Sequence, residues 1–249
     1  MRIAINQISL NPSAIARIVG AVAFLLVLAS IGGQFSKFVL GHDYLKGFVP
    51  LFYIDEERNI PTYFSVLLML FSALLLAAIA VLNGKQRIHH VSKWAILSFG
   101  FLFMAFDEAF LVHERLISPV RTLLGNSNLR VFYFAWVIPG IPLVLVLGLF
   151  FLRFLLHLPA TARLRFLMAA TLYIGGAIGL ELIGGRYAEL HGTQNWTYSM
   201  IVTVEESLEM AGLIVFIWAL LKYCADNYKV VQFRFEAQQG AAPDRELGR

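Results

Sequence analysis

The sequence predicts an all-α membrane protein, folded as a bundle of about six transmembrane helices. Hydrophobic residues make up 59% of the 249-residue chain, charged residues make up only 14%, and the mean hydropathy is +0.71. Soluble domains carry about 25% charged residues. Six apolar runs each reach the ~20 residues that a helix needs to cross a hydrocarbon core of ~30 Å. The chain is long enough for one bundle with short loops, without a separate soluble domain.

The six runs alternate with shorter polar segments, and they cover approximately residues 14–39, 62–83, 93–114, 131–156, 164–188 and 200–223. The first run follows two arginines, as a cleaved signal sequence would, but it is long enough to span a membrane and we expect it to remain as a helix. We predict a transmembrane helical domain over residues 1–224. Residues 225–249 are the predicted tail, and we expect its end to be disordered.

The basic residues predict the orientation of the bundle. Of the 20 Lys and Arg, 13 lie near the two chain ends and in the segments that follow the second and fourth runs. The positive-inside rule then places both termini in the cytoplasm. With the termini there, the third and fifth helices run outward and the sixth runs inward. We therefore expect a multi-pass protein of the bacterial inner membrane whose acidic residues lie near the outer face.

Two outer segments connect the helices. Segment 41–61 is the longest loop, and its aromatic residues are expected at the membrane interface. Its acidic residues would lie near the mouth of a site if the loop folds inward, but for Glu56 and Glu57 we favour a solvated turn. Segment 115–130 has apolar residues at helical spacing, interrupted by Pro119, and is predicted to lie along the interface.

Acidic residues inside the apolar runs are the main functional signal. Ionisable groups at membrane depth are costly, and they usually face a bundle interior or a cavity and take part in function. In the sixth run Glu205, Glu206 and Glu209 fall within one narrow arc at 100° per residue. Glu209 would lie ~12 Å below the outer edge of the apolar core, too deep for a short acid to reach water.

The third run carries a second acidic group. Asp107 and Glu114 are seven residues apart and share a helix face, and His113 lies on a neighbouring flank. Glu108 is turned by about 100° and ranks lower as a site residue.

The fifth run carries Glu181 among small residues. Five glycines surround it and allow neighbouring helices to approach closely: Gly175, Gly176, Gly179, Gly184 and Gly185. Arg186 follows and can offset a single negative charge.

Carboxylates gathered in a space of low dielectric constant cannot all stay ionised without a cation, shared protons or access to water. Carboxylates with one imidazole suit hard or borderline ions, so we expect a divalent metal, namely zinc, iron, manganese, magnesium or calcium. Helical bundles hold metal pairs in this way, but the Glu-x-x-His spacing of di-iron sites is absent here. A single metal or a carboxylate-rich pair remains open.

Other classes of function are less favoured. Some intramembrane acids have no catalytic role and simply form hydrogen bonds between helices. An accessory subunit of a larger membrane complex would use them in this way. Proton or cation transport would need a relay below Glu209, where the sixth run reads Ala-Gly-Leu-Ile-Val-Phe-Ile. Basic residues form no aromatic-interleaved patch, which argues against a nucleic-acid partner. The single Cys224 excludes an internal disulfide and a multi-cysteine metal site.

Three short patterns resemble those of uncharacterised bacterial integral membrane proteins. They are Asn-Ile-Pro-Thr-Tyr-Phe-Ser at 59–65, Asp107-Glu108 with His113-Glu114, and Glu-Glu-Ser-Leu-Glu at 205–209. The resemblance spans most of the membrane region and implies no activity, although it suggests that the outer loop and the acidic helices form one unit. A likeness to alkaline ceramidase-like hydrolases ranks low, because those proteins hold zinc with several histidines.

The leading hypothesis is a metal-dependent membrane enzyme that acts on a lipid or another membrane-soluble substrate. Five residues are the predicted metal ligands: His113, Glu114, Glu205, Glu206 and Glu209. Asp107 and Glu181 are the predicted catalytic residues, as general base or in support of the ligands. Membrane lipid is the expected partner, with other membrane subunits as the alternative.

Overall fold

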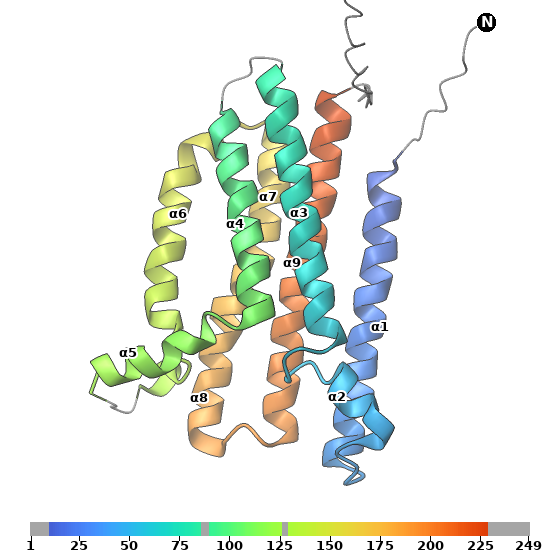
Figure 1. The fold of residues 1–249 in the computed structure, drawn as a ribbon, viewed down its shortest axis with the longest axis vertical. Helices are drawn as coiled ribbons and strands as arrows, with labels where there is room; N and C mark the ends of the chain where they lie inside the picture. Colours follow the sequence, from blue (N-terminus) through green and yellow to red (C-terminus); the bar gives the residue numbers. More distant parts are fainter. Residues whose placement is uncertain (1–9, 86–89, 126–128, 229–249) are drawn as a thin grey trace, which may run out of the picture.

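The structure is a computed structural model that describes residues 10–85, 90–125 and 129–228, and these form a long helical bundle (Figure 1). The long helices are α1 (Pro12–Phe38), α3 (Ile60–Lys85), α4 (Val91–Phe110), α6 (Val137–His157), α7 (Ala160–Ile174), α8 (Glu181–His191) and α9 (Trp196–Asn227). The short elements are η1 (Leu45–Gly47), α2 (Phe48–Phe52), η2 (Glu114–Leu116), α5 (Ile117–Leu123), η3 (Arg130–Phe132) and the π-helical turn η4 (Gly175–Leu180). The π-helical turn joins α7 and α8 into one span.

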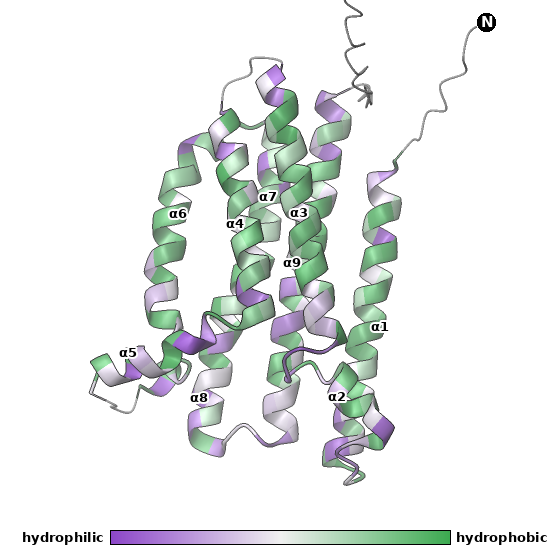
Figure 2. Ribbon diagram, viewed as in Figure 1, coloured by the Kyte–Doolittle hydropathy of each residue, from purple (hydrophilic) through white to green (hydrophobic). Residues whose placement is uncertain are grey.

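The helices fit a multi-pass membrane protein. Within the described ranges, five helical segments are long and apolar enough to cross a membrane, and the bent pair of α4 and α5 makes six if it counts as one span. Hydrophobic residues cover most of each long helix, whereas hydrophilic ones gather around the lower ends of α4 and α9 (Figure 2). The all-helical fold of about six spans is therefore confirmed. The start of α1 and the end of α9 lie at the same end of the bundle (Figure 1).

The third predicted span ends earlier than its apolar run. Helix α4 stops at Phe110, because Leu111 adopts a left-handed conformation with a φ of 55°. The Asp107 side chain then accepts a hydrogen bond from the backbone N–H of His113 at 2.7 Å. The chain turns by 71° into the η2–α5 segment, so Asp107 and Glu114 do not share one continuous helix face.

Helix α5 follows this turn and lies at the side of the bundle, below α6 and at a steep angle to the long helices (Figure 1). Pro119 occupies its first turn, where a missing backbone N–H costs nothing, so it does not interrupt the helix. The fourth span starts at Val137 and not at 131, since residues 130–132 form the separate turn η3.

Helix α9 is the central element, and it packs against α1, α3, α7, η4 and α8. Two glycines allow the closest approach. A Cβ on Gly212 would lie 2.7 Å from the backbone nitrogen of Tyr173, and a Cβ on Gly176 would lie 2.8 Å from the backbone oxygen of Glu205. Only glycine fits at either point. Because these two residues have no side chain, α7 and η4 can pack directly against the backbone of α9.

The bundle's aromatic core lies at the end where α1 begins. Trp94 of α4 is 1% exposed and meets Phe154 of α6 and Tyr223 of α9, at ring-centroid distances of 5.0 and 4.9 Å. Helix α9 passes the predicted domain boundary at residue 224 and continues to Asn227, and the buried Tyr228 donates a hydrogen bond to Asn83 at 2.7 Å. The rest of the predicted tail, from residue 229, lies outside the described residues.

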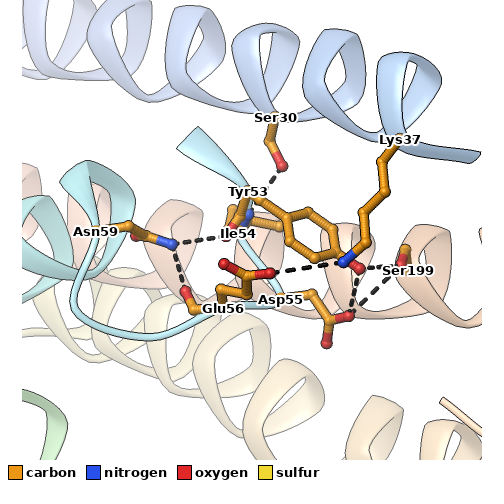
Figure 3. A network of polar contacts seen from close by, with 8 residues as sticks. All are labelled: Ser30, Lys37, Tyr53, Ile54, Asp55, Glu56, Asn59 and Ser199. Atoms are coloured by element: carbon orange, nitrogen blue, oxygen red, sulfur yellow. Dashed lines mark hydrogen bonds and ion pairs between the residues drawn. The ribbon is translucent and has the colours of Figure 1, made fainter. Parts of the chain in front are cut away.

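The segment predicted to be the outer loop, residues 41–61, folds against the bundle and is fixed to α1 and α9 (Figure 3). Tyr53 is 1% exposed, and its hydroxyl group lies 2.5 Å from Ser199 Oγ of α9 and donates to Asp55 at 2.7 Å. The backbone N–H of Ile54 donates to Ser30 of α1 at 3.0 Å. These contacts place the segment that carries Asp55 beside the first half of α9, near Ser199.

The motif at 59–65 explains how the loop ends. Asn59 caps α3, because its side-chain oxygen accepts hydrogen bonds from the backbone N–H and the hydroxyl group of Thr62, at 3.0 and 2.9 Å. Its amide nitrogen donates back to the carbonyl oxygens of Tyr53 and Glu56. One buried side chain thus sets both the loop conformation and the start of the helix.

Candidate functional site

A cavity of about 390 Å³ lies among α4, α6, α7–α8 and α9, at the bundle end opposite the aromatic core. All seven predicted site residues line it: Asp107, His113, Glu114, Glu181, Glu205, Glu206 and Glu209. Asp55, Glu57 and Glu108 line it as well. Nine carboxyl groups therefore surround one imidazole ring, and no Lys or Arg of the described residues lies in this lining.

His113 is held in one orientation by Asp107. The Nδ1 atom of His113 lies 2.9 Å from Asp107 Oδ2, and Asp107 Oδ1 accepts the backbone N–H of the same histidine. The imidazole also packs against Trp136, with 5.0 Å between ring centroids. A carboxylate at Nδ1 favours the tautomer with its proton on that atom, which leaves Nε2 available to a ligand. Asp107 is thus in a position to orient the histidine.

The π-helical turn precedes Glu181 and positions its side chain. Trp136 Nε1 donates a hydrogen bond to Glu181 Oε1 at 2.7 Å. Glu205 of α9 lines the same cavity as Glu181. Glu181 therefore joins the segment before α6 to α8 within the site.

Glu209 is the deepest acid on α9 and lines the cavity together with Tyr173 of α7. The neighbouring glycine, Gly176, lets α9 approach so closely that a Cβ there would lie 2.8 Å from the Glu209 side chain. The predicted role of the glycines is confirmed at this position. At Gly175 and Gly179, in contrast, an added Cβ would meet nothing within 4 Å, so these two do not serve close packing.

Arg186 does not neutralise the acids. It forms an ion pair with Glu189, one turn along α8, and neither residue lines the cavity. The charge compensation that its position after Glu181 suggested is therefore absent from the described part of the chain.

The loop at 41–61 contributes two acids that were not among the predicted site residues, Asp55 and Glu57. Asp55 is held by Tyr53 and Ser199, and its desolvation raises the pKa of its carboxyl group. Glu57 is an exposed residue at the cavity wall, where desolvation and the negative charges of Glu108 and Glu114 raise its pKa to about 7. The solvated turn that we favoured holds for Glu56, which is exposed and paired with Lys37 at 3.5 Å, but Glu57 belongs to the site.

Two further features bear on what the cavity can bind. Among the described residues, no three His, Cys, Asp or Glu side chains are arranged so that they could hold a metal ion. The second feature is that much of the lining is apolar, above all the part contributed by α4 and α6: Gly100, Phe103, Met104, Gly140, Leu143, Val144 and Leu147. The site is thus acidic at one end and hydrocarbon-like at the other.

Comparison with known proteins gives a family but no activity. No curated protein and no solved structure matches the chain. A family model described as a domain of unknown function (DUF8692) matches residues 17–224, which contain every residue of the cavity lining. The chain belongs to this family of unknown function, and what its members do has to be inferred from the site itself.

Proposed function

We propose that this protein is a metal-dependent membrane enzyme that acts on a lipid or another membrane-soluble substrate inside the acid-lined cavity. One observation carries the proposal, namely that nine carboxyl groups converge on one imidazole with no Lys or Arg in the lining of the described structure. Desolvated carboxylates at such density need positive charge or bound protons. A divalent cation supplies both the charge and a Lewis acid for catalysis.

The residues divide into two roles. His113, Glu114, Glu205, Glu206 and Glu209 are the proposed ligands, since they come from two separate segments that face the same cavity. Asp107 positions His113 through its hydrogen bond to Nδ1. Glu181, held by Trp136, is the proposed general base.

This ligand set suits oxygen-preferring or borderline ions, which include magnesium, calcium, manganese, iron and zinc. No three of these side chains are already arranged around one point in the described chain, so the proposal requires that they move when the ion binds. Trp136 contacts both Glu181 and His113, and its fluorescence should report this movement.

The direct test is elemental analysis of purified protein. We would treat the protein with EDTA, load it separately with each of the five ions, and measure the bound metal by mass spectrometry. The wild type should retain one ion stoichiometrically, and Glu205→Gln with Glu209→Gln should abolish retention. Asp107→Asn should lower the affinity by about 10–100-fold, the usual effect of losing a group that orients a metal ligand.

Glu189→Gln is the matched control. Glu189 is a carboxylate of α8, the helix that also carries Glu181, but it pairs with Arg186 and lies outside the cavity lining. If the wild type holds no ion, or if Glu189→Gln loses the ion as readily as the double variant, the metal centre is refuted. For activity, loaded protein in nanodiscs would be incubated with a membrane lipid extract, and products that disappear with EDTA would be sought by mass spectrometry.

A second candidate function is an accessory subunit of a larger membrane complex, which the exposure of α6 favours. In the described structure α6 is buried mainly at its two ends, at Val137 and Phe154, and only 11% of its most apolar stretch is buried. Co-purification of partner chains at a fixed ratio, unchanged by Glu205→Gln and Glu209→Gln, would support this function. Transport is less favoured, because Leu213, Ile217 and Leu220 fill the bundle beyond Glu209.

The proposed enzyme lies in a bacterial inner membrane with both termini in the cytoplasm. The two described chain ends lie at one end of the bundle and the acids near the other, which is compatible with this orientation (Figure 1). Accessibility of cysteines introduced at Glu189 and at Asp226 to a membrane-impermeant thiol reagent would test it.

A further inference from the structure

The wall between α4 and α6 is the apolar part of the cavity lining, and the contacts between these two segments in the described structure lie at its two ends. At one end, Trp94 contacts Phe154 and Lys93 donates to the backbone oxygen of Phe150 at 3.3 Å. At the other end the His113 ring packs on Trp136. Between these contacts lie side chains that line the cavity and are also exposed, and we call this stretch the window.

The residues at this window are apolar and open. Phe103 of α4 is 55% exposed and Leu143 of α6 is 57% exposed, although both line the cavity. Gly100 lines the cavity too, and a Cβ added there would meet nothing within 4 Å. Gly100 lies seven residues from Asp107, so the apolar part extends ~10 Å along α4 from the acids.

The charge of the site selects among amphiphiles. The polar end carries nine carboxyl groups and no Lys or Arg in the described lining, which repels an anionic headgroup. The aromatic rings of Trp136, Tyr173 and Tyr198 line the same end and suit an uncharged or cationic group. The volume of about 390 Å³ falls within the range of small-molecule sites.

We infer that a single-chain amphiphile without a negative charge enters laterally between α4 and α6, with its hydrocarbon chain along Gly100, Leu143 and Leu147 and its head among the acids. That this amphiphile is the substrate of the enzyme rests on the proposed function. That the amphiphile binds in the cavity requires only the window and the charge of the cavity.

Photo-crosslinking in nanodiscs tests the inference. The probes are three dodecyl chains of equal length with a terminal diazirine, carrying a hydroxyl, a trimethylammonium or a sulfonate head. Peptide mapping by mass spectrometry should place the label of the first two probes on the cavity side of α4 and α6, around Gly100 and Leu147. The sulfonate should label only residues that face bulk lipid.

Gly100→Trp is the variant that fills the apolar part, and Gly148→Trp on α6 is its control. Both glycines are exposed helix positions where an added Cβ meets nothing within 4 Å, but Gly148 does not line the cavity. Gly100→Trp should lower labelling at Leu147 by about tenfold, a loss of the size that overpacking a site produces. Gly148→Trp should leave labelling at wild-type levels.

Equal labelling by the three probes, or equal labelling of the two variants, would overturn the inference.

The crosslinking is repeated after EDTA treatment, which separates this inference from the proposed metal centre. A protein that holds no metal but keeps the labelling pattern loses the metal centre and retains the lateral site. A protein that holds metal but shows no cavity labelling retains the metal centre and loses the lateral site.

Discussion

The two ends of the bundle are built from the same helices but packed in opposite ways. At one end α4, α6 and α9 meet through Trp94, Phe154 and Tyr223, whose rings leave little space between them. At the other end the same helices surround the cavity, where acids and apolar residues face one another across about 390 Å³. Close packing and the candidate site therefore lie in different halves of the same spans.

This division follows from side-chain size and charge. The aromatic end gains free energy from burial and ring contacts. The cavity end gathers like charges, and its stability depends on close helix approach at glycines and on the hydrogen bonds of the outer loop. Four substitutions, described below, test whether the two halves differ in stability in this way.

The largest effect is expected for Trp94→Ala in the packed half. Trp94 is 1% exposed, and its loss should lower the free energy of unfolding by about 3–5 kcal/mol, the usual cost of removing a buried aromatic ring. Trp136→Ala in the cavity half should cost much less, since Trp136 is only partly buried beside an existing space. Denaturant titration in detergent would measure both, and equal costs would contradict the division.

Gly176→Val should have the next largest effect, about 1–3 kcal/mol of destabilisation from overpacking. A Cβ there would lie 2.8 Å from the backbone oxygen of Glu205, which cannot move without shifting α9. Gly179→Val carries the same change of helix propensity at an open position and is the control. Thermal unfolding of the pair isolates the contact, and a milder effect at Gly176 than at Gly179 would argue against close packing there.

The sequence anticipated the fold better than the details of the site. Hydropathy placed the spans to within a few residues, but α9 runs from Trp196 to Asn227, beyond the predicted 200–223, because helices continue past the apolar core. The break after Phe110 could not be predicted, since Leu111 is an apolar residue that rarely adopts a positive φ. That break depends on the hydrogen bond from the His113 backbone to Asp107.

The seven predicted site residues do line one cavity, because acids at membrane depth have few other places to lie. Helix rotation misjudged Glu108, which lines the cavity beside Asp107 despite the 100° between them. Asp55 and Glu57 were placed near the mouth of a site only if the loop folds inward, and they were left out of the predicted site residues. Their position depends on Tyr53, which is buried against α9 only in the folded chain. The adjacent aromatic residues at 52–53 were the available signal.

Tyr53→Phe tests how much the outer loop contributes to the cavity half. It removes the hydroxyl group that contacts Asp55 and Ser199, and we expect a loss of about 1.5 kcal/mol, as for one buried hydrogen bond. Tyr63→Phe on the exposed surface of α3 is the control. Hydrogen exchange of residues 53–59 should rise in the first variant only, and unchanged exchange would show that the loop is held by other contacts.

The smallest effect is expected for Glu57→Gln, and it depends on pH. The raised pKa of about 7 means that folded Glu57 binds its proton more tightly than the unfolded chain does. Its contribution to stability is therefore present at low pH and is lost as the pH rises from about 4.5 to about 7. In EDTA-treated protein, Glu57→Gln should melt like the wild type at pH 5 and at a higher temperature at pH 8. If Glu57→Gln raised the melting temperature at pH 5 but not at pH 8, the result would contradict a raised pKa of Glu57 in the folded protein.

The π-helical turn at Gly175–Leu180 determines the direction, around the helix axis, in which the side chains that follow it in the span point. Such a turn behaves as one inserted residue, and each residue of an α-helix advances by about 100°. Shortening the turn by a single glycine would swing Glu181 off the cavity and onto a neighbouring face of the helix, without altering the length of apolar chain in the bilayer by more than ~1.5 Å. A one-residue deletion there would thus separate membrane insertion from the chemistry of the site.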